Sequence, residues 1–253
     1  MLTDCHAHLD LYLKNECLNQ ILLESENRNV RYIIHAGLEK RSNLFGLKIH
    51  EREKMILPAL GLYPEEVVKK SKSEIKEELE FIKQNLNKAV AISEVGLDGT
   101  YGNMGKQKEV LKEIVKIAVK NNKSLIIHTR KAEQETINLL DEIIPSENLL
   151  YRKIVFHCFT GKKKMIPKIL KLGWFFSIPP IAVRSEQFKE LIKLVPLNRM
   201  LTETDSPFLS PKPNERNYPW NVSITIEEIS KIKMVSAQEV ENNIFMNFAY
   251  LFL

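Results

Sequence analysis

The sequence lacks the features that mark secreted and membrane-spanning proteins. No stretch approaches the roughly 18 uninterrupted apolar residues that a membrane span requires. The first residues form neither a basic segment nor an apolar run, so we expect no secretory signal. Only three cysteines are present, Cys5, Cys17 and Cys158, and their spacing is not that of a metal-binding knuckle. This pattern is typical of a reducing compartment and predicts a cytoplasmic protein with no membrane partner.

The sequence also lacks the motifs of nucleotide-binding α/β proteins. No Gly-x-Gly-x-x-Gly segment follows an apolar run, and there is no phosphate-loop motif. These absences count against an open doubly wound sheet, which is the competing α/β architecture. There is no short repeat, low-complexity tract or linker rich in proline, glycine and serine, so we expect one domain over residues 1–253. Nothing marks a subunit interface, and the oligomeric state stays open.

Short apolar runs alternate with amphipathic segments along the whole chain. The runs are brief, rich in β-branched and aromatic residues and without polar alternation, which is typical of parallel strands buried on both faces. They cover residues 2–4, 32–36, 56–60, 89–93, 124–127, 153–156, 174–178 and 200–204. Eight strands separated by helices, in a chain of 253 residues, match a closed barrel, which needs about 250 residues. The sequence therefore predicts an α/β fold, a (β/α)8 TIM-type barrel.

Some amphipathic segments carry clear helix signals. We expect helices over 74–87 and 106–121, and in the second of these the apolar residues recur at helical spacing. Capping-box pairs, Ser71 with Glu74 and Ser236 with Glu239, mark expected helix starts. The proline-rich segment 207–219 is interpreted as a long loop after the eighth strand, followed by two terminal helices.

Only six histidines occur in the chain, and their positions are informative. Four of them and two carboxylates follow or close expected strands: His6, His8, Glu94, His128, His157 and Asp205. The carboxyl ends of barrel strands meet at one face, so these six side chains are expected to converge. His6 and His8 are two residues apart and therefore point to the same side of an extended chain. The other two, His35 and His50, are interpreted as a structural residue within a strand and a surface residue on a helix.

This mixture of imidazole and carboxylate groups suits a divalent metal centre. Such donors bind zinc, manganese, iron or cobalt, and the carboxylate-rich part also suits magnesium. Six ligands are too many for one ion with an open position, but they suit two ions that share a carboxylate. Glu94 lies on the fourth strand, midway between the two groups of ligands, and is the expected bridge. The sequence thus predicts two divalent metal ions (Zn, Mg or Mn) as cofactors.

Five motifs in chain order carry a family resemblance. They are Thr3-Asp4-Cys5-His6-Ala7-His8-Leu9-Asp10, Glu94-Val95-Gly96-Leu97-Asp98, Ile127-His128-Thr129-Arg130, Phe156-His157-Cys158-Phe159-Thr160-Gly161 and Thr202-Glu203-Thr204-Asp205-Ser206-Pro207. Over essentially its whole length the chain resembles the TatD family of metal-dependent deoxyribonucleases, within the amidohydrolase-like barrels. The resemblance implies one ion on His6, His8 and Asp205, a second on His128 and His157, and Glu94 as the bridge. It also implies hydrolysis of DNA phosphodiester bonds, often from a strand end.

One segment departs from the family pattern. After the third strand the family usually has a Gly-x-His-Pro-His type of segment, whereas this chain has Gly61-Leu62-Tyr63-Pro64-Glu65. Tyr63 is a candidate substrate contact that donates a hydrogen bond, but a phenol that titrates at about 10 is a poor proton shuttle at neutral pH. Glu65 brings negative charge toward an expected anion site. The departure leaves the identity of the substrate open.

Further roles follow from position relative to the expected ligands. Asp205 is placed to accept the proton of the attacking water, and Glu94 and Asp205 are the candidate catalytic residues. Glu203, two residues earlier on the same strand face, is expected to hold a metal ligand in orientation. Arg130, two residues beyond His128, either binds a substrate phosphate with two hydrogen bonds or faces solvent.

Basic and aromatic residues around the expected site allow two interpretations each. The net charge of +5 fits an anionic partner such as DNA, or a solvated lysine-rich surface. Lys162, Lys163 and Lys164 either contact a phosphate backbone or form a solvated run. Tyr218 and Trp220 either stack on bases or pack against the rim of the barrel.

Three functions are compatible with these residues. The first is a deoxyribonuclease or related phosphodiesterase. The second is a metal-dependent hydrolase of another bond, such as an ester, amide, lactone or aminoacyl-tRNA ester, since one binuclear barrel site supports many chemistries. The third is a nucleic-acid-binding protein with weak turnover, against which the complete ligand set argues. Arg130, Arg216 and the lysine run favour a phosphate-containing substrate, and we expect DNA.

Overall fold

The computed structural model describes residues 1–12 and 18–253, so Cys17 lies outside the described residues. Its eight parallel strands are hydrogen-bonded in chain order: β1 (Leu2–Ala7), β2 (Val30–Ala36), β3 (Ile56–Leu60), β4 (Ala91–Asp98), β5 (Ser124–Arg130), β6 (Ile154–Phe156), β7 (Phe175–Ile178) and β8 (Met200–Thr202). At the seam, the His8 amide donates to the Ser206 carbonyl, and the Asp205 amide donates to the His6 carbonyl, both at 2.8 Å. These bonds join β1 to the chain after β8, which confirms the predicted barrel and excludes an open doubly wound sheet.

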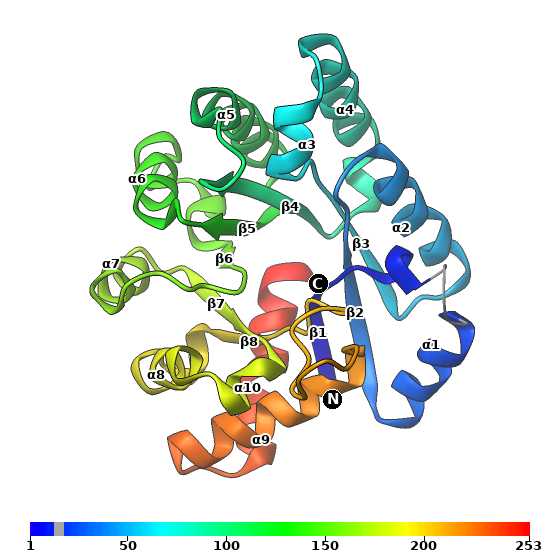
Figure 1. The fold of residues 1–253 in the computed structure, drawn as a ribbon, viewed down its shortest axis with the longest axis vertical. Coiled ribbons are helices and arrows are strands. Elements are labelled where there is room, and N and C mark those ends of the chain that lie inside the picture. Colours follow the sequence, from blue (N-terminus) through cyan, green and yellow to red (C-terminus); the bar gives the residue numbers. More distant parts are fainter. Residues whose placement is uncertain (13–17) are drawn as a thin grey trace.

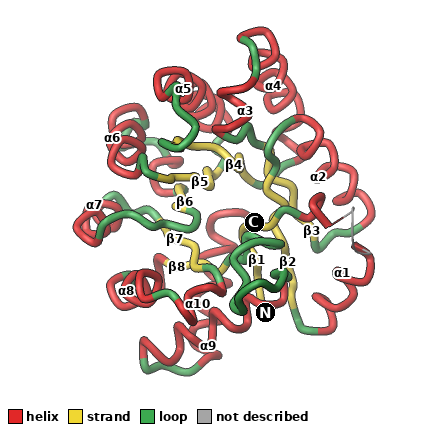
Figure 2. The backbone as a smooth tube through the Cα atoms, viewed as in Figure 1, coloured by secondary structure: helices red, strands yellow, loops and turns green. Residues whose placement is uncertain are grey.

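All helices but the last form an outer ring around the strands, and the last lies across one end of the barrel (Figure 1). The helices are α1 (Leu18–Asn27), α2 (Lys40–Arg52), α3 (Pro64–Lys69), α4 (Lys72–Asn85), α5 (Met104–Asn121), α6 (Glu133–Ile143), α7 (Ile166–Lys171), α8 (Glu186–Leu194), α9 (Val222–Lys233) and α10 (Ala237–Phe252). Figure 2 shows the long predicted loop between β8 and α9 as an irregular segment. None of the described helices combines the length and apolar character needed to cross a membrane.

The helix predicted over 74–87 is α4, and its start follows the predicted capping box. The Ser71 hydroxyl accepts a hydrogen bond from the Glu74 amide at 3.3 Å, while the Glu74 carboxylate accepts one from the Ser71 amide at 2.7 Å. The helix ends at Asn85, two residues earlier than predicted, because the chain tightens into a 3-10 turn over Leu86–Lys88. Ser236 likewise caps α10 by accepting from the Glu239 amide at 3.1 Å.

Three strands extend further toward the carboxyl end than the sequence predicts. β1, β4 and β5 include polar residues that we assigned to the segments after or at the strand ends. His6, Glu94 and His128 therefore lie within strands, and the prediction that Glu94 and His128 close theirs is wrong. The strands continue because β4 and β5 stay paired, with Gly96 opposite His128. The barrel wall thus holds several candidate ligands on regular backbone.

A cluster of small and apolar side chains fills the inside of the barrel. Residues from all eight strands contribute, among them Cys5, Ile34 and Val155, and three residues of α10 pack against them: Phe248, Leu251 and Phe252. The Asn247 side-chain amide fixes α10 in place by donating to the carbonyls of Leu197 and Met200, both at 2.8 Å. Because α10 closes the amino end of the strands, the open end of the barrel is the carboxyl end (Figure 1).

Candidate metal centre

The six predicted ligands lie together at the carboxyl end of the barrel. They come from β1 and the residue after it (His6, His8), from β4 (Glu94), from β5 (His128), and from the positions following β6 (His157) and β8 (Asp205). The most exposed of these side chains is that of Asp205, at 15%. Ionisable groups buried this deeply need partners, and each finds them within the cluster.

Glu94 lies between two groups of histidines. Its Oε2 atom is 3.4 Å from Nε2 of both His6 and His8. Its Oε1 atom is 2.7 Å from Nδ1 of His128 and 3.8 Å from Nε2 of His157. Each carboxylate oxygen therefore faces one group of histidines, which is the arrangement that a shared ligand requires.

Asp205 completes the group around His6 and His8. Its Oδ1 atom is 3.2 Å from Nε2 of His8 and 3.6 Å from Nε2 of His6. The residue adopts a left-handed backbone conformation with φ of 53°, which aspartate tolerates better than most residues. Its amide is bonded to the His6 carbonyl, so the seam of the barrel fixes this carboxylate beside the two histidines.

A second partner orients each histidine ring through its other nitrogen. Two rings contact carboxylates: Nδ1 of His157 is 2.6 Å from Glu203 Oε2, and Nε2 of His128 is 2.9 Å from Asp98 Oδ2. The other two contact neutral groups: Nδ1 of His8 is 3.1 Å from the Ala36 carbonyl, and Nδ1 of His6 is 3.4 Å from the Ser93 hydroxyl. Such contacts fix the tautomer and ring orientation of histidines that bind metals. The nitrogens that remain are those directed at Glu94 and Asp205.

Glu203 lies behind His157, fully buried. Besides the ring nitrogen of His157, its carboxylate accepts hydrogen bonds from the Ser177 hydroxyl at 2.7 Å and the Cys158 amide at 2.9 Å. Three donors hold the carboxylate in one position. The side chain faces a ligand and not the cavity. Because β8 ends at Thr202, the prediction that Glu203 and Asp205 share a strand face is wrong.

Three further aspartates near the centre are not singled out by the sequence. Asp98 contacts His128, and its other oxygen accepts from the amide and hydroxyl of Thr100. Asp4 accepts from the amides of His6 and Thr204. Asp10 lines the cavity, and its buried Oδ1 has no hydrogen-bond partner among the described residues. All three lie inside motifs that carry ligands, but chain spacing does not tell which side chain meets which histidine.

The surroundings of the two carboxylates keep them ionised. Burial raises the pKa of Glu94, but hydrogen bonds from His128, His6 and His8 outweigh burial and leave its pKa well below the ordinary value. Burial also raises the pKa of Asp205, and the hydrogen bond from His8 with the nearby histidines again lowers it overall. The centre therefore carries buried negative charge that requires cations.

The surroundings of two histidines also favour positive charge, because they raise the pKa of each ring. Burial lowers the pKa of His157, but the carboxylate of Glu203 raises it overall to about 9. Burial also lowers the pKa of His8, but hydrogen bonds with Asp205 and Glu94 raise it well above the ordinary value. Divalent cations would supply the charge that protons on these rings otherwise provide.

The donor atoms fit divalent metal ions. Nitrogen and oxygen atoms form three overlapping groups, each within 4.8 Å: His6 with His8 and Glu94, His6 with His157 and Asp205, and Glu94 with His128 and His157. Imidazole and carboxylate donors of this kind suit zinc and manganese, and the carboxylates also suit magnesium. The buried, oriented and negatively charged set of side chains is therefore a candidate metal centre.

A cavity of about 800 Å³ opens onto this cluster. Its wall includes Arg130, whose exposed guanidinium has no partner among the described residues, and Tyr63, whose ring packs edge-to-face with that of His128 at a centroid distance of 5.0 Å. Burial raises the pKa of Tyr63, and the charge of Glu94 adds to this, so the phenol stays protonated. Both side chains face the space that a substrate would occupy.

Residues 61–65, the segment that departs from the family pattern, lie at the rim of the cavity. This part of the rim is less negative than the sequence suggests. Glu65, at the start of α3, also lines the cavity, but its carboxylate is 2.9 Å from Nζ of Lys69. Glu66 shares Lys69 at 3.5 Å and contacts Lys70 at the same distance. These lysines offset part of the negative charge that Glu65 brings to the site.

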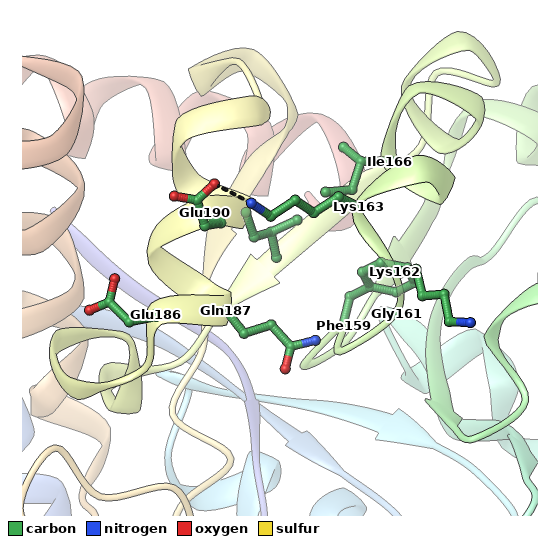
Figure 3. Close-up of a pocket in the computed structure, with 9 residues that line it drawn as sticks. Phe159, Gly161, Lys162, Lys163, Ile166, Glu186, Gln187 and Glu190 are labelled. Atoms are coloured by element: carbon green, nitrogen blue, oxygen red, sulfur yellow. Dashed lines mark hydrogen bonds and ion pairs between the residues drawn. The ribbon is translucent and has the colours of Figure 1, made fainter.

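The three lysines after β6 do not share one environment. Figure 3 shows Lys163 reaching across a groove to Glu190 of α8, with a distance of 2.6 Å from Nζ to Oε2. Lys162 points away from this ion pair. Among the described residues, neither Lys162 nor Lys164 has an ion-pair partner. Two of the three lysines are therefore available to an anion.

The loop aromatics pack against the rim and not into the cavity. Tyr218 and Trp220 stack on each other with a centroid distance of 4.5 Å and nearly parallel rings, and Arg28 lies over Trp220 at 5.2 Å. Arg216 lies over Tyr12 at 5.3 Å. Of the two interpretations drawn from the sequence, packing against the rim is the one that this arrangement fits.

Comparison with known proteins identifies relatives over the whole chain. The family model described as TatD related DNase matches residues 3–253. Human deoxyribonuclease TATDN3 is 32% identical over 256 residues, which cover 94% of this chain and 90% of that protein. An uncharacterized metal-dependent hydrolase of Methanocaldococcus jannaschii is 30% identical over 244 residues, covering 96% of this chain and 94% of that protein.

Solved structures share the fold. YJJV, a TatD homolog from Escherichia coli K12, matches with a TM-score of 0.85 at 24% identity and covers 99% of this chain and 97% of its own. A TatD family hydrolase from Entamoeba histolytica gives a TM-score of 0.84 at 21% identity, covering 100% of this chain and 98% of its own. The barrel, the family model and the relatives agree, and the chain belongs to the TatD family of DNases, as a metal-dependent hydrolase.

Proposed function

We propose that the chain hydrolyses phosphodiester bonds of DNA at a centre of two divalent metal ions (Zn, Mg or Mn). The observation that carries the two-ion assignment is Glu94, whose two oxygens face separate groups of histidines. In this proposal His6, His8 and Asp205 would hold one ion, His128 and His157 would hold the other, and Glu94 would be shared by both. When bound, such ions offset the charge of the phosphate and make water at the centre more acidic.

Asp205 and Glu94 are the proposed catalytic residues. Asp205 lines the cavity, and because its pKa is lowered its carboxylate is ionised at neutral pH. It is therefore able to accept the proton that the attacking water releases. Glu94 lies between the two groups of histidines and directs one oxygen at each group. Glu203 and Asp98 position His157 and His128 from behind.

The proposed substrate contacts are Arg130, Tyr63 and two lysines of the loop after β6. The guanidinium of Arg130 presents two parallel N–H groups that match a phosphate. The protonated phenol of Tyr63 donates a hydrogen bond to a substrate oxygen but does not shuttle protons. Lys162 and Lys164 extend the positive charge along that loop, where a single strand would continue from the cavity.

The relatives support DNA as the substrate, because the human relative is named a deoxyribonuclease. A cytoplasmic location is a further proposal, supported by the free thiols of Cys5 and Cys158. The alternatives are hydrolysis of another bond (ester, amide, lactone or aminoacyl-tRNA ester) and nucleic-acid binding with weak turnover. The following experiment separates DNA cleavage from both.

The test is the degradation of end-labelled single-stranded DNA by purified protein with magnesium or manganese. We expect cleavage by the wild type and a loss of about 100-fold or more in Glu94→Ala and Asp205→Ala. The variants Glu113→Ala and Asp141→Ala change surface carboxylates outside the centre and serve as controls. Intact DNA in the presence of metal-loaded wild type would overturn the proposed substrate.

A further inference from the structure

Phe208 is an exposed aromatic side chain at the mouth of the candidate metal centre. It is 53% exposed, whereas the other ten phenylalanines of the chain, all of them described, are buried or partly buried. Its ring lines the same cavity as His8 and Asp205. A single exposed apolar residue is common on protein surfaces, so exposure alone carries little weight. The position of the ring and the way its backbone is held are the informative features.

Hydrogen bonds fix the backbone on both sides of Phe208. Its amide donates to the Asp205 carbonyl at 2.8 Å, and the Asn217 amide donates to the carbonyl of the preceding residue at 3.0 Å. After it, the Arg184 guanidinium donates to the Ser210 carbonyl at 3.2 Å. Asn217 itself is fully buried. A ring presented from a backbone held in this way loses little conformational freedom when a ligand packs against it.

The ring lies next to one group of candidate ligands. Its centroid is 6.2 Å from that of the His8 ring, at an interplanar angle of 65°. A phosphate at the ions that Glu94 and Asp205 would hold brings the base of the adjoining nucleotide within reach of this ring, because only the sugar separates base from phosphate. The same cavity presents the exposed guanidinium of Arg130. An aromatic surface and a phosphate-binding cation in one cavity match the two halves of a nucleotide.

We propose that Phe208 is the surface on which the nucleobase next to the cleaved bond stacks, and that this contact favours unpaired bases. The inference rests on the proposed DNA-cleaving function and adds a specificity determinant to it. Stacking suits every base because each has a π face, so sequence preference is expected to be weak. A base inside a duplex is already stacked and paired, and must leave the helix before it reaches Phe208.

The experiment compares two short single strands, one with normal bases and one with abasic residues throughout. For each variant we measure kcat/KM on both strands and divide the value for the base-bearing strand by the value for the abasic strand. Phe208→Ala is expected to lower this ratio by about 5- to 100-fold, mainly through KM on the base-bearing strand. Phe208→Trp keeps the ratio. Tyr250→Ala is the matched control, because Tyr250 is an aromatic residue with the same 53% exposure on α10, at the closed end of the barrel.

Other results would overturn the proposal. An unchanged ratio in Phe208→Ala would show that the ring does not contact the base. An equal loss of kcat/KM on both strands would show that the residue acts only on the structure of the centre.

A binding measurement distinguishes failure of the proposed function from failure of the stacking contact. In the Asp205→Asn background, fluorescence anisotropy reports affinity for both strands without cleavage, and Phe208→Ala must weaken binding of the base-bearing strand selectively. Wild type could cleave neither strand while Phe208→Ala still weakens binding of the base-bearing strand alone. That result would reject the proposed DNA cleavage and keep the stacking contact.

Discussion

His128 shows how a single hydrogen bond decides which atom of a ring is available to a metal ion. Its Nε2 atom is 2.9 Å from Asp98 and its Nδ1 atom is 2.7 Å from Glu94. The Asp98 carboxylate is fully buried and is also held by the amide and hydroxyl of Thr100. Turning the ring would leave buried polar atoms without partners. Asp98 therefore positions Nδ1 of His128 without touching the cavity itself.

The variant Asp98→Asn is expected to weaken metal binding by about 10- to 100-fold, as is usual when the partner behind a metal-bound histidine is changed. Calorimetric titration of metal-free protein with Mn²⁺ measures the effect directly. Asp141→Asn is the control, because Asp141 lies outside the centre and its partners are Lys168 and the Tyr151 hydroxyl, both at 3.1 Å. Equal affinity of Asp98→Asn and wild type would show that the contact does not govern the metal.

At the scale of elements, the chain at the end of β3 lies so close to β4 that Gly61, the residue after β3, has no room for a side chain. A Cβ atom there would lie 2.2 Å from the Glu94 nitrogen and 2.3 Å from the Ser93 carbonyl carbon. The side-chain amide of Asn43, on α2, donates to the Gly61 carbonyl at 2.8 Å and accepts from the Gly61 amide at 2.9 Å. A residue outside the ligand set thus fixes the chain at the end of β3, which lies against the backbone of Glu94.

Gly61→Ala is expected to destabilise the protein by about 1–3 kcal/mol and to weaken metal binding, because the backbone at Glu94 must move. Gly105→Ala makes the same change in the first turn of α5, where no atom lies within 4 Å of the new Cβ. That variant is expected to gain about 0.5–1 kcal/mol, since alanine favours the helix. Urea denaturation compares the two. Equal stability would contradict the close approach of β3 to Glu94.

The regular elements could be predicted because each leaves a local signal. The short apolar runs predicted eight strands, and the Ser71 capping box predicted the start of α4. The loops could not be predicted in the same way. Tyr218 and Trp220 look from the sequence like base-stacking candidates, yet they pack on each other. Phe208 lies in the cavity because long-range bonds, such as that from Asn217 to the Thr204 carbonyl at 2.7 Å, set the path of its loop.

At the scale of the whole molecule, the barrel explains why residues distant in the chain predicted one site. Parallel strands end at the same face, so ligand-type side chains on or after five strands converge whatever their separation. Their partners follow no such rule. Whether Asp98 or another carboxylate meets His128 depends on the register of β4 against β5, which includes an irregularity between Ile92 and Val95. The sequence therefore predicted the candidate ligands and pointed to Glu203 as the partner of one, but not to the groups behind the other histidines.

Lys162 and Lys164, in the segment after β6, contribute to the net charge of +5. If Lys162 and Lys164 bind the substrate backbone, Lys162→Ala/Lys164→Ala lowers the salt dependence of cleavage. Each lysine–phosphate pair that the substitutions remove is expected to reduce the slope of log kcat/KM against log salt by about 0.7 for single-stranded DNA. Lys112→Ala/Lys116→Ala removes the same charge from the outer face of α5 and is the control. If both double variants have the same slope, the change in salt dependence comes from net charge alone and not from contacts of Lys162 and Lys164 with the substrate.

The most direct test of the two-ion centre is the number of metal ions that the protein binds. Equilibrium dialysis against Mn²⁺, followed by metal analysis, is expected to give two ions per wild-type chain. His6→Ala/His8→Ala and His128→Ala/His157→Ala are each expected to retain one, because each removes one of the histidine groups on either side of Glu94. One ion in wild type, or an unchanged number in both double variants, would contradict a two-ion centre bridged by Glu94.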